Sequence, residues 1–177
     1  MSTREDLRRF SQLPIDFDAI SLAEPGVPQE PYFCDPPERE HVGRTGCDGV
    51  HFILLPGDER VFCVDPAMGE EGTYVLPVAE DFRQFLSFVL FCGGSDPIAQ
   101  IGWLSRPRFD ALVAEGRQTE WPERDAALSA VAAAFALTGE DPYETVKALQ
   151  AAFDPAGLRF SEEYYDVLGL EPPPPAR

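Results

Sequence analysis

The sequence predicts an α+β fold, with an antiparallel meander sheet in the N-terminal half packed with helices, and a helical C-terminal half. Short apolar runs separated by turn residues fall between residues 50 and 78, a pattern typical of strands. From residue 79 the apolar side chains recur every three or four positions, which is typical of amphipathic helices. With 44% hydrophobic and 11% aromatic residues among 177, the chain has enough apolar material for a packed core and is not expected to be disordered.

The first segment combines a short helix with a long proline-rich arm. Residues 4–11 are expected to form the helix, and residues 13–44 a loop with prolines at positions 14, 25, 28, 31, 36 and 37. So long a loop is uncommon inside a domain. Its aromatic density favours an arm that wraps the surface over a flexible leader. The expected anchors of this arm are Phe17, Ile20, Leu22, Tyr32 and Phe33.

Three strands are expected after the arm. Residues 50–55 and 61–65 are apolar runs, and residues 56–60 between them are rich in turn-forming types, so the pair is predicted to be an antiparallel hairpin. Residues 72–78 form the third strand of the meander. Pro77 cannot donate a backbone hydrogen bond, which places it near the end of its strand or at the edge of the sheet.

Five helices are expected after the strands. The first covers residues 79–92, with Glu80 and Asp81 in its first turn and glycines 93 and 94 after its end. Capping residues, first-turn prolines and terminal glycines indicate four more: residues 106–115 between Ser105 and Gly116, residues 122–137 before Thr138 and Gly139, residues 142–153 with Asp141 as the N-cap and Pro142 in the first position, and a short helix from Ser161. Trp103 and Trp121 are expected to pack in the core or between helices.

These elements predict one α+β domain over residues 1–171. It consists of the arm (residues 1–45), a strand region (residues 46–78) and a mainly helical region (residues 79–171), and a flexible proline-rich tail follows at residues 172–177. The longest apolar stretches are too short to span a bilayer, and the N-terminus lacks the apolar run of a signal peptide. We therefore expect a cytoplasmic protein.

The chain is strongly acidic. Its 31 Asp and Glu against 14 Lys and Arg give a formal net charge of −17, which disfavours binding to nucleic-acid phosphates or to anionic membranes. Residues 45–78 hold six acidic residues and one basic residue, residues 119–177 hold eleven and four, and residues 79–118 hold five and four. The excess acid on the hairpin loops and the last helices is either a solubility coat or a surface complementary to a basic protein.

No catalytic motif is present. The four cysteines contain no Cys-x-x-Cys pair and are expected to be reduced, half-buried thiols: Cys34, Cys47, Cys63 and Cys92. Neither a metal nor a cofactor is predicted. Two alternatives stay open: a small cysteine- or metal-dependent hydrolase would use Cys47 with His41 or His51, and a regulatory subunit would recruit its partner through the proline-rich tail.

Part of the strand region resembles a known family. Residues 46–52, which contain Gly46, Asp48 and Gly49, look like a glycine–aspartate entry to a strand. Residues 61–65 look like the following strand, which ends in an acid, and residues 78–86 look like a strand-to-helix segment. Together, residues 46–86 resemble the SUKH superfamily of bacterial toxin-immunity proteins and fungal cell-wall regulators. The resemblance implies an immunity protein whose partner is a secreted or contact-delivered toxin, such as a nuclease.

The expected function is therefore non-enzymatic: an acidic protein-binding domain that docks a basic protein and, as an immunity protein, occludes a basic toxin domain. Its carboxylates would occupy the surface that such a toxin uses for nucleic-acid phosphates. The candidate contacts are six acids of the strand region: Asp48, Asp58, Glu59, Asp65, Glu70 and Glu71. No oligomeric state is predicted.

Overall fold

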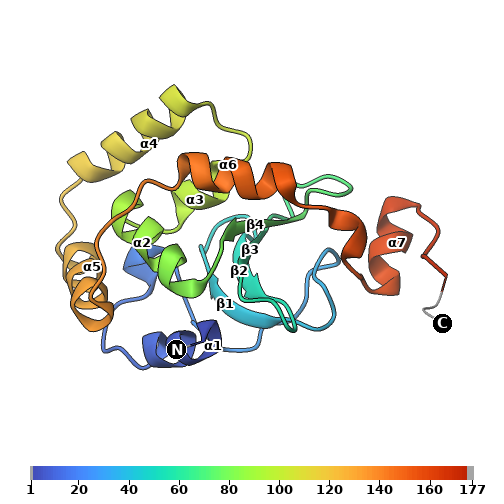
Figure 1. Ribbon diagram of the computed structural model, residues 1–177, viewed down its shortest axis with the longest axis horizontal. Coiled ribbons are helices and arrows are strands. Elements are labelled where there is room, and N and C mark those ends of the chain that lie inside the picture. The colour runs from blue at the N-terminus through green and yellow to red at the C-terminus, as the bar shows by residue number, and fades with distance from the viewer. Residues whose placement is uncertain (1, 175–177) are drawn as a thin grey trace.

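The computed structural model describes residues 2–174 of the chain. An α-helix and a short 3₁₀ helix precede four consecutive strands, and the other helices follow the strands (Figure 1). In chain order the elements are α1 (Thr3–Ser11), the 3₁₀ helix η1 (Asp18–Ile20), β1 (Glu40–Arg44), β2 (His51–Leu54), β3 (Val61–Val64), β4 (Val75–Ala79), α2 (Phe82–Cys92), α3 (Asp96–Gln100), α4 (Arg106–Gln118), α5 (Pro122–Phe135), α6 (Tyr143–Ala152), the 3₁₀ helix η2 (Pro155–Gly157) and α7 (Glu162–Leu168).

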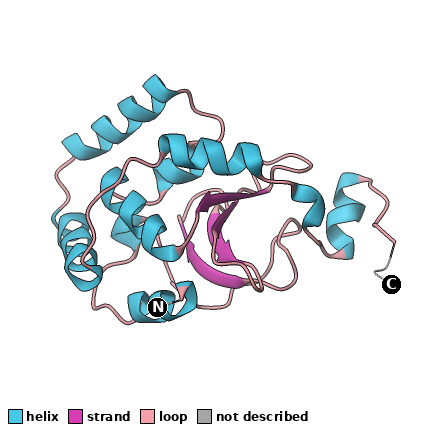
Figure 2. Cartoon of the chain, viewed as in Figure 1, coloured by secondary structure: helices cyan, strands magenta, loops and turns pink. Residues whose placement is uncertain are grey.

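The strands form one antiparallel sheet in the order β1-β2-β3-β4, so each strand pairs with its neighbour in the sequence (Figure 2). Phe52 pairs with Cys63, and Cys63 pairs with Leu76. The predicted α+β class and the meander are confirmed. Pro77 lies on β4, an edge strand, as its missing N–H requires.

The strand β1 corrects the prediction of a loop through residue 44. Its sequence, Glu-His-Val-Gly-Arg, has one aliphatic side chain and lacks the apolar alternation by which strands are recognised. Tertiary contacts place it instead. Arg44 and Ala23 exchange both backbone hydrogen bonds, and a Cβ atom on Gly43 would come within 3.2 Å of Leu22.

Both faces of the sheet are covered, which explains why β2 and β3 are continuous apolar runs. Successive residues of a strand point to opposite faces, and every residue of these two strands is buried. Phe52 and Cys63 belong to the core shared with the helices from α1 to α6, together with Phe85 and Val131. Figure 1 shows these helices on one side of the sheet and α7 on the other.

Two segments that are far apart in the sequence cover the second face. Ile53 and Phe62 of the sheet form a separate core with Cys34 of the arm and Tyr164 of α7. Residues 153–170 therefore lie across the sheet on the side away from α1 to α6 (Figure 1).

The arm packs on the sheet around buried anchors. Ile20 and Leu22 are fully buried, and Tyr32, although 46% exposed, stacks on His51 of β2 with 5.5 Å between the ring centroids. The buried carboxylate of Asp35 also attaches the arm to the sheet. It accepts a hydrogen bond from Tyr32 N–H at 2.8 Å and lies 2.8 Å from His51 Nε2 and 3.4 Å from Arg39 Nε.

Several helix boundaries differ from the prediction because capping contacts decide them. Asp81 is the N-cap of α2, where its carboxylate accepts a hydrogen bond from Gln84 N–H at 2.8 Å, and neither Glu80 nor Asp81 lies in the first turn. α4 continues through Gly116 to Gln118, since the Arg124 guanidinium donates to Gly116 O at 2.8 Å and satisfies the end of the helix.

The structure also corrects the predictions for the end of α5, for the segment that forms α3 and for the two tryptophans. α5 ends at Phe135, followed by Ala136 in the left-handed conformation (φ 52°). The sequence does not predict α3, because a helix of five residues is too short to show apolar periodicity. Trp103 and Trp121 are 53% and 42% exposed. Both lie in connections between helices, which run over the surface.

The C-terminal region completes the described chain. Residues 171–174 of the predicted tail have no regular secondary structure, and residues 175–177 lie outside the described part. None of the helices formed by residues 2–174 is both long enough and apolar enough to cross a bilayer.

Candidate functional site

The six predicted contact carboxylates lie at two ends of the sheet. Because neighbouring strands are antiparallel, the β1–β2 loop and the β3–β4 loop share one end, and the β2–β3 turn lies at the other. Asp48, Asp65, Glu70 and Glu71 are therefore at the first end, and Asp58 and Glu59 at the second. Four-residue strands separate these ends by about 10 Å or more, so the six acids do not form one surface.

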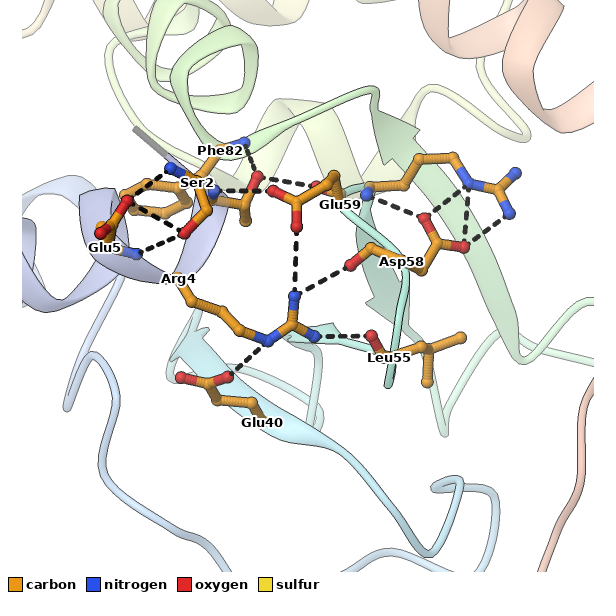
Figure 3. A network of polar contacts seen from close by, with 10 residues as sticks. Ser2, Arg4, Glu5, Glu40, Leu55, Asp58, Glu59 and Phe82 are labelled. Atoms are coloured by element: carbon orange, nitrogen blue, oxygen red, sulfur yellow. Dashed lines mark hydrogen bonds and ion pairs between the residues drawn. The ribbon is translucent and has the colours of Figure 1, made fainter.

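At the second end, the acids are used to attach α1 (Figure 3). The carboxylate of Glu59 accepts a hydrogen bond from Thr3 N–H at 2.7 Å and lies 3.5 Å from Arg4 Nη1. Arg4 also donates to Leu55 O at 2.7 Å and pairs with Glu40 at 3.2 Å. Glu59 is thus occupied by contacts within the chain.

The carboxylate of Asp58, in the same turn, is also paired within the chain. The Arg60 guanidinium donates to both of its carboxylate oxygens, at 2.7 Å and 3.0 Å for the shortest contacts (Figure 3). Burial acts to raise the pKa of Asp58, but the hydrogen bonds and charge of Arg60 outweigh it and lower the pKa. The pKa of Glu59 is lowered by the hydrogen bonds from Thr3 and by the charge of Arg4. Their partners make both acids poor candidates for binding another protein.

At the first end, the β3–β4 loop of residues 65–74 is shaped by its own polar groups. Asp65 Oδ1 accepts hydrogen bonds from the backbone N–H groups of Ala67 and Met68, at 3.1 Å and 2.9 Å. A Cβ atom on Gly69 would lie 2.5 Å from Asp65 O, so only glycine allows the chain to pass so close. The loop conformation is therefore determined by its sequence.

The two glutamates of this loop point into solvent. Glu70 and Glu71 are exposed. Within residues 2–174, their carboxylates make no hydrogen bond or ion pair. Unlike Asp58 and Glu59, these two acids are available to a partner.

One exposed apolar side chain of this loop, Met68, lines a hollow together with a second, Trp103. Met68 is 63% exposed and Trp103 is 53% exposed. Both border a hollow of about 200 Å³ between the sheet edge and the helices α3 and α6, whose floor includes Leu76 and Ala99. Methionine and tryptophan are enriched at protein interfaces. In the sequence, Trp103 follows Gly102, precedes the helix expected from residue 106 and belongs to no periodic apolar pattern. Its position is the signal that could have indicated this exposed surface.

The cysteine and histidine cluster lies at the β1–β2 loop. Cys47, His41 and His51 line a separate hollow of about 160 Å³. Cys47 is exposed, which corrects the prediction for this thiol, and its Sγ donates to Asp48 Oδ2 at 3.3 Å. That hydrogen bond and the charge of Asp48 raise the pKa of Cys47, which lowers the fraction of nucleophilic thiolate.

Neither histidine is arranged as a base for this thiol. His51 Nε2 lies 2.8 Å from Asp35 Oδ1, and its Nδ1 lies 2.7 Å from Gly49 O, so both ring nitrogens already have partners. Burial lowers the pKa of His41 to about 4, and the neighbouring His51 and Arg39 act in the same direction. The described residues contain no group of three or more His, Cys, Asp or Glu placed to hold a metal ion.

The largest hollow, of about 640 Å³, lies on the second face of the sheet between the arm and residues 153–160. Its lining includes Phe62 and Phe153, which lie under the Arg60 guanidinium at 5.1 Å and 5.5 Å from the ring centroids. That guanidinium is already paired with Asp58. The hollow therefore offers no unpaired buried charge to a ligand.

Comparisons of the chain with protein-family models, with curated proteins and with solved structures found no match. The resemblance of residues 46–86 to the SUKH superfamily thus stays a hypothesis.

Proposed function

We propose that this chain is a non-enzymatic, acidic protein-binding domain that docks a basic protein through the end of its sheet formed by the β3–β4 loop. One observation carries the proposal: Glu70 and Glu71, without partners among the described residues, belong to the same loop as Met68, whose exposed side chain lines a hollow together with Trp103. Interfaces typically combine an apolar anchor in a hollow with a charged rim.

The charge of the chain supports the same partner class. A net charge of −17 accelerates the encounter with a basic protein through long-range attraction and disfavours acidic partners. Asp48 lies at the same end of the sheet and extends the acidic surface, whereas Asp58 and Glu59 contribute only to the long-range field. The contact surface is thus smaller than the sequence suggested.

The SUKH resemblance extends the proposal to the biological partner. On this hypothesis the partner is the basic domain of a toxin, and the protein acts in the cytoplasm as its immunity protein. Glu70 and Glu71 would lie where the toxin binds nucleic-acid phosphates, so docking blocks the toxin by occlusion. No catalytic step by this chain is needed.

The test is a pair of neutralised variants with equal net charge. Glu70→Gln/Glu71→Gln removes two carboxylates at the proposed surface. Glu115→Gln/Glu120→Gln removes two exposed carboxylates at the far end of α4 and in the segment that follows it, away from the β3–β4 loop in Figure 1. The probe is a synthetic peptide with one arginine flanked by lysines, and calorimetry measures its affinity.

Exposed ion pairs contribute about 0.2–1 kcal/mol each, so the first variant should bind the peptide about two- to thirtyfold more weakly. The second variant should bind it nearly as well as the wild type, since only the long-range field changes. Equal losses in the two variants would mean that the peptide senses net charge alone, and would reject docking at this loop.

A further inference from the structure

The hollow between Met68 and Trp103 has the size of one side chain. Its volume is about 200 Å³. A hollow of this volume has room for a single long side chain. Sites for drug-sized ligands are larger, at about 300–1,000 Å³.

The lining combines apolar residues with one carboxylate. Leu76, Ala99 and Cys63 contribute apolar surface, and the indole of Trp103 borders the opening. Asp65 also lines the hollow. Its Oδ1 is occupied by two backbone N–H groups, and its Oδ2 accepts no hydrogen bond from the residues that the structure describes.

These surfaces fit a side chain with an apolar stem and a planar cationic head. A purely apolar occupant would bury part of Asp65 without compensating its charge, which is unfavourable. A lysine ammonium is compact and strongly hydrated, whereas a guanidinium is planar, stacks on indole rings and bonds carboxylates with two N–H groups. Asp65 is the one carboxylate among the residues that line the hollow, and Lys147, the nearby cation, donates to Gly102 O at 2.9 Å, so Asp65 is the group left for a partner's cation.

We infer that this hollow receives one arginine side chain of the basic partner, with its stem on Leu76 and Ala99, its guanidinium against Trp103 and its N–H groups directed to Asp65 Oδ2. The inference rests on the proposed function and specifies the anchor of that interface. Glu70 and Glu71 attract the partner, and the arginine determines how it is seated.

Trp103 supplies a direct reporter. The chain has two tryptophans, so Trp121→Phe leaves Trp103 as the single indole fluorophore. In this background we would titrate the arginine peptide, the same peptide with lysine in place of arginine, and the same peptide with neutral citrulline. The arginine peptide should change the Trp103 emission and bind at least severalfold more tightly than the other two.

Matched substitutions locate the anchor without the fluorescence readout. Trp103→Leu removes the indole face but keeps an apolar side chain, and should weaken binding of the arginine peptide about two- to thirtyfold in calorimetry. Trp121→Leu is the control, because Trp121 is exposed to a similar extent and lies outside the hollow. Its affinity should stay at the wild-type value.

The outcomes separate the two proposals. Equal affinity for the arginine and lysine peptides, with loss only in Glu70→Gln/Glu71→Gln, overturns the arginine anchor and leaves the proposed function in place. Binding that does not depend on Glu70 and Glu71 overturns the proposed function, and the anchor with it. Selective loss of the arginine peptide in Trp103→Leu supports both.

Discussion

Asp35 should stabilise the fold more than any surface carboxylate. Its side chain is 1% exposed and has three neighbours that can donate: Tyr32 N–H, His51 Nε2 and Arg39 Nε. A neutral imidazole has one N–H, yet both nitrogens of His51 face oxygen acceptors, on Asp35 and Gly49. The imidazole therefore links Gly49 and Asp35, while the Arg39 guanidinium supplies a positive charge beside the buried carboxylate.

The substitution Asp35→Asn keeps the shape and removes this charge. The amide NH₂ replaces one acceptor, so a buried donor such as Tyr32 N–H meets another donor, at a cost of about 1–3 kcal/mol. Loss of the charge opposite His51 and Arg39 adds to this, because breaking a buried pair costs about 3–5 kcal/mol. We expect the free energy of unfolding to fall by at least about 4 kcal/mol, which lowers the Tm by at least about 8 °C for a chain of this size.

Urea denaturation and limited proteolysis test this prediction together. The arm at residues 13–44 should become the first site of cleavage in Asp35→Asn. The matched control is Asp166→Asn, which removes one exposed carboxylate from α7 and should change stability by less than about 0.5 kcal/mol. The reasoning is refuted if the two variants unfold at the same urea concentration.

Three further predictions follow from single contacts. Phe62→Ala, at a fully buried position under the C-terminal segment, should lower the free energy of unfolding by about 3–5 kcal/mol in urea; a loss below about 1 kcal/mol would contradict the second core. Asp48→Asn should speed the alkylation of Cys47 by iodoacetamide at neutral pH, because Asp48 raises the pKa of that thiol; an unchanged rate would contradict the assignment. Glu59 has a pKa below its usual 4.5, so its contribution to folding stability is complete above that value and is lost as the pH falls through the lower, folded-state pKa. The free energy of unfolding of Glu59→Gln should therefore fall less steeply with acid than that of the wild type. Parallel plots of unfolding free energy against pH would be inconsistent with the Thr3 contact.

Local patterns predicted most of the fold. The apolar runs of residues 50–55 and 61–65 became β2 and β3, and the change of period at residue 79 marked α2. These elements are recognisable because their own side chains form the core. β1 has no such pattern and is held by pairing with β2 and with Ala23, which is information that lies outside its own residues.

The candidate site was predictable only in part. The sequence identified Glu70 and Glu71 as loop acids, but acids in a second loop looked the same. Asp58 and Glu59 differ because α1, more than 50 residues away, places Thr3 and Arg4 against their turn. Trp103 was expected inside because tryptophan is mostly apolar, and its exposure depends on where the short helix α3 ends. The charge and hydrophobicity of a residue are evident from the sequence around it, whereas the residues that contact it in the fold are not.

The central claim is that a basic partner binds at the end of the sheet formed by the β3–β4 loop. Chemical-shift mapping of the ¹⁵N-labelled chain during titration with the arginine peptide tests this claim most directly. We predict that the shifts concentrate on residues 65–74 and on the Trp103 indole N–H, and that they weaken as salt rises, because exposed charges are screened. Shifts that spread evenly over the acidic surface, or that centre on residues 55–60, would contradict it.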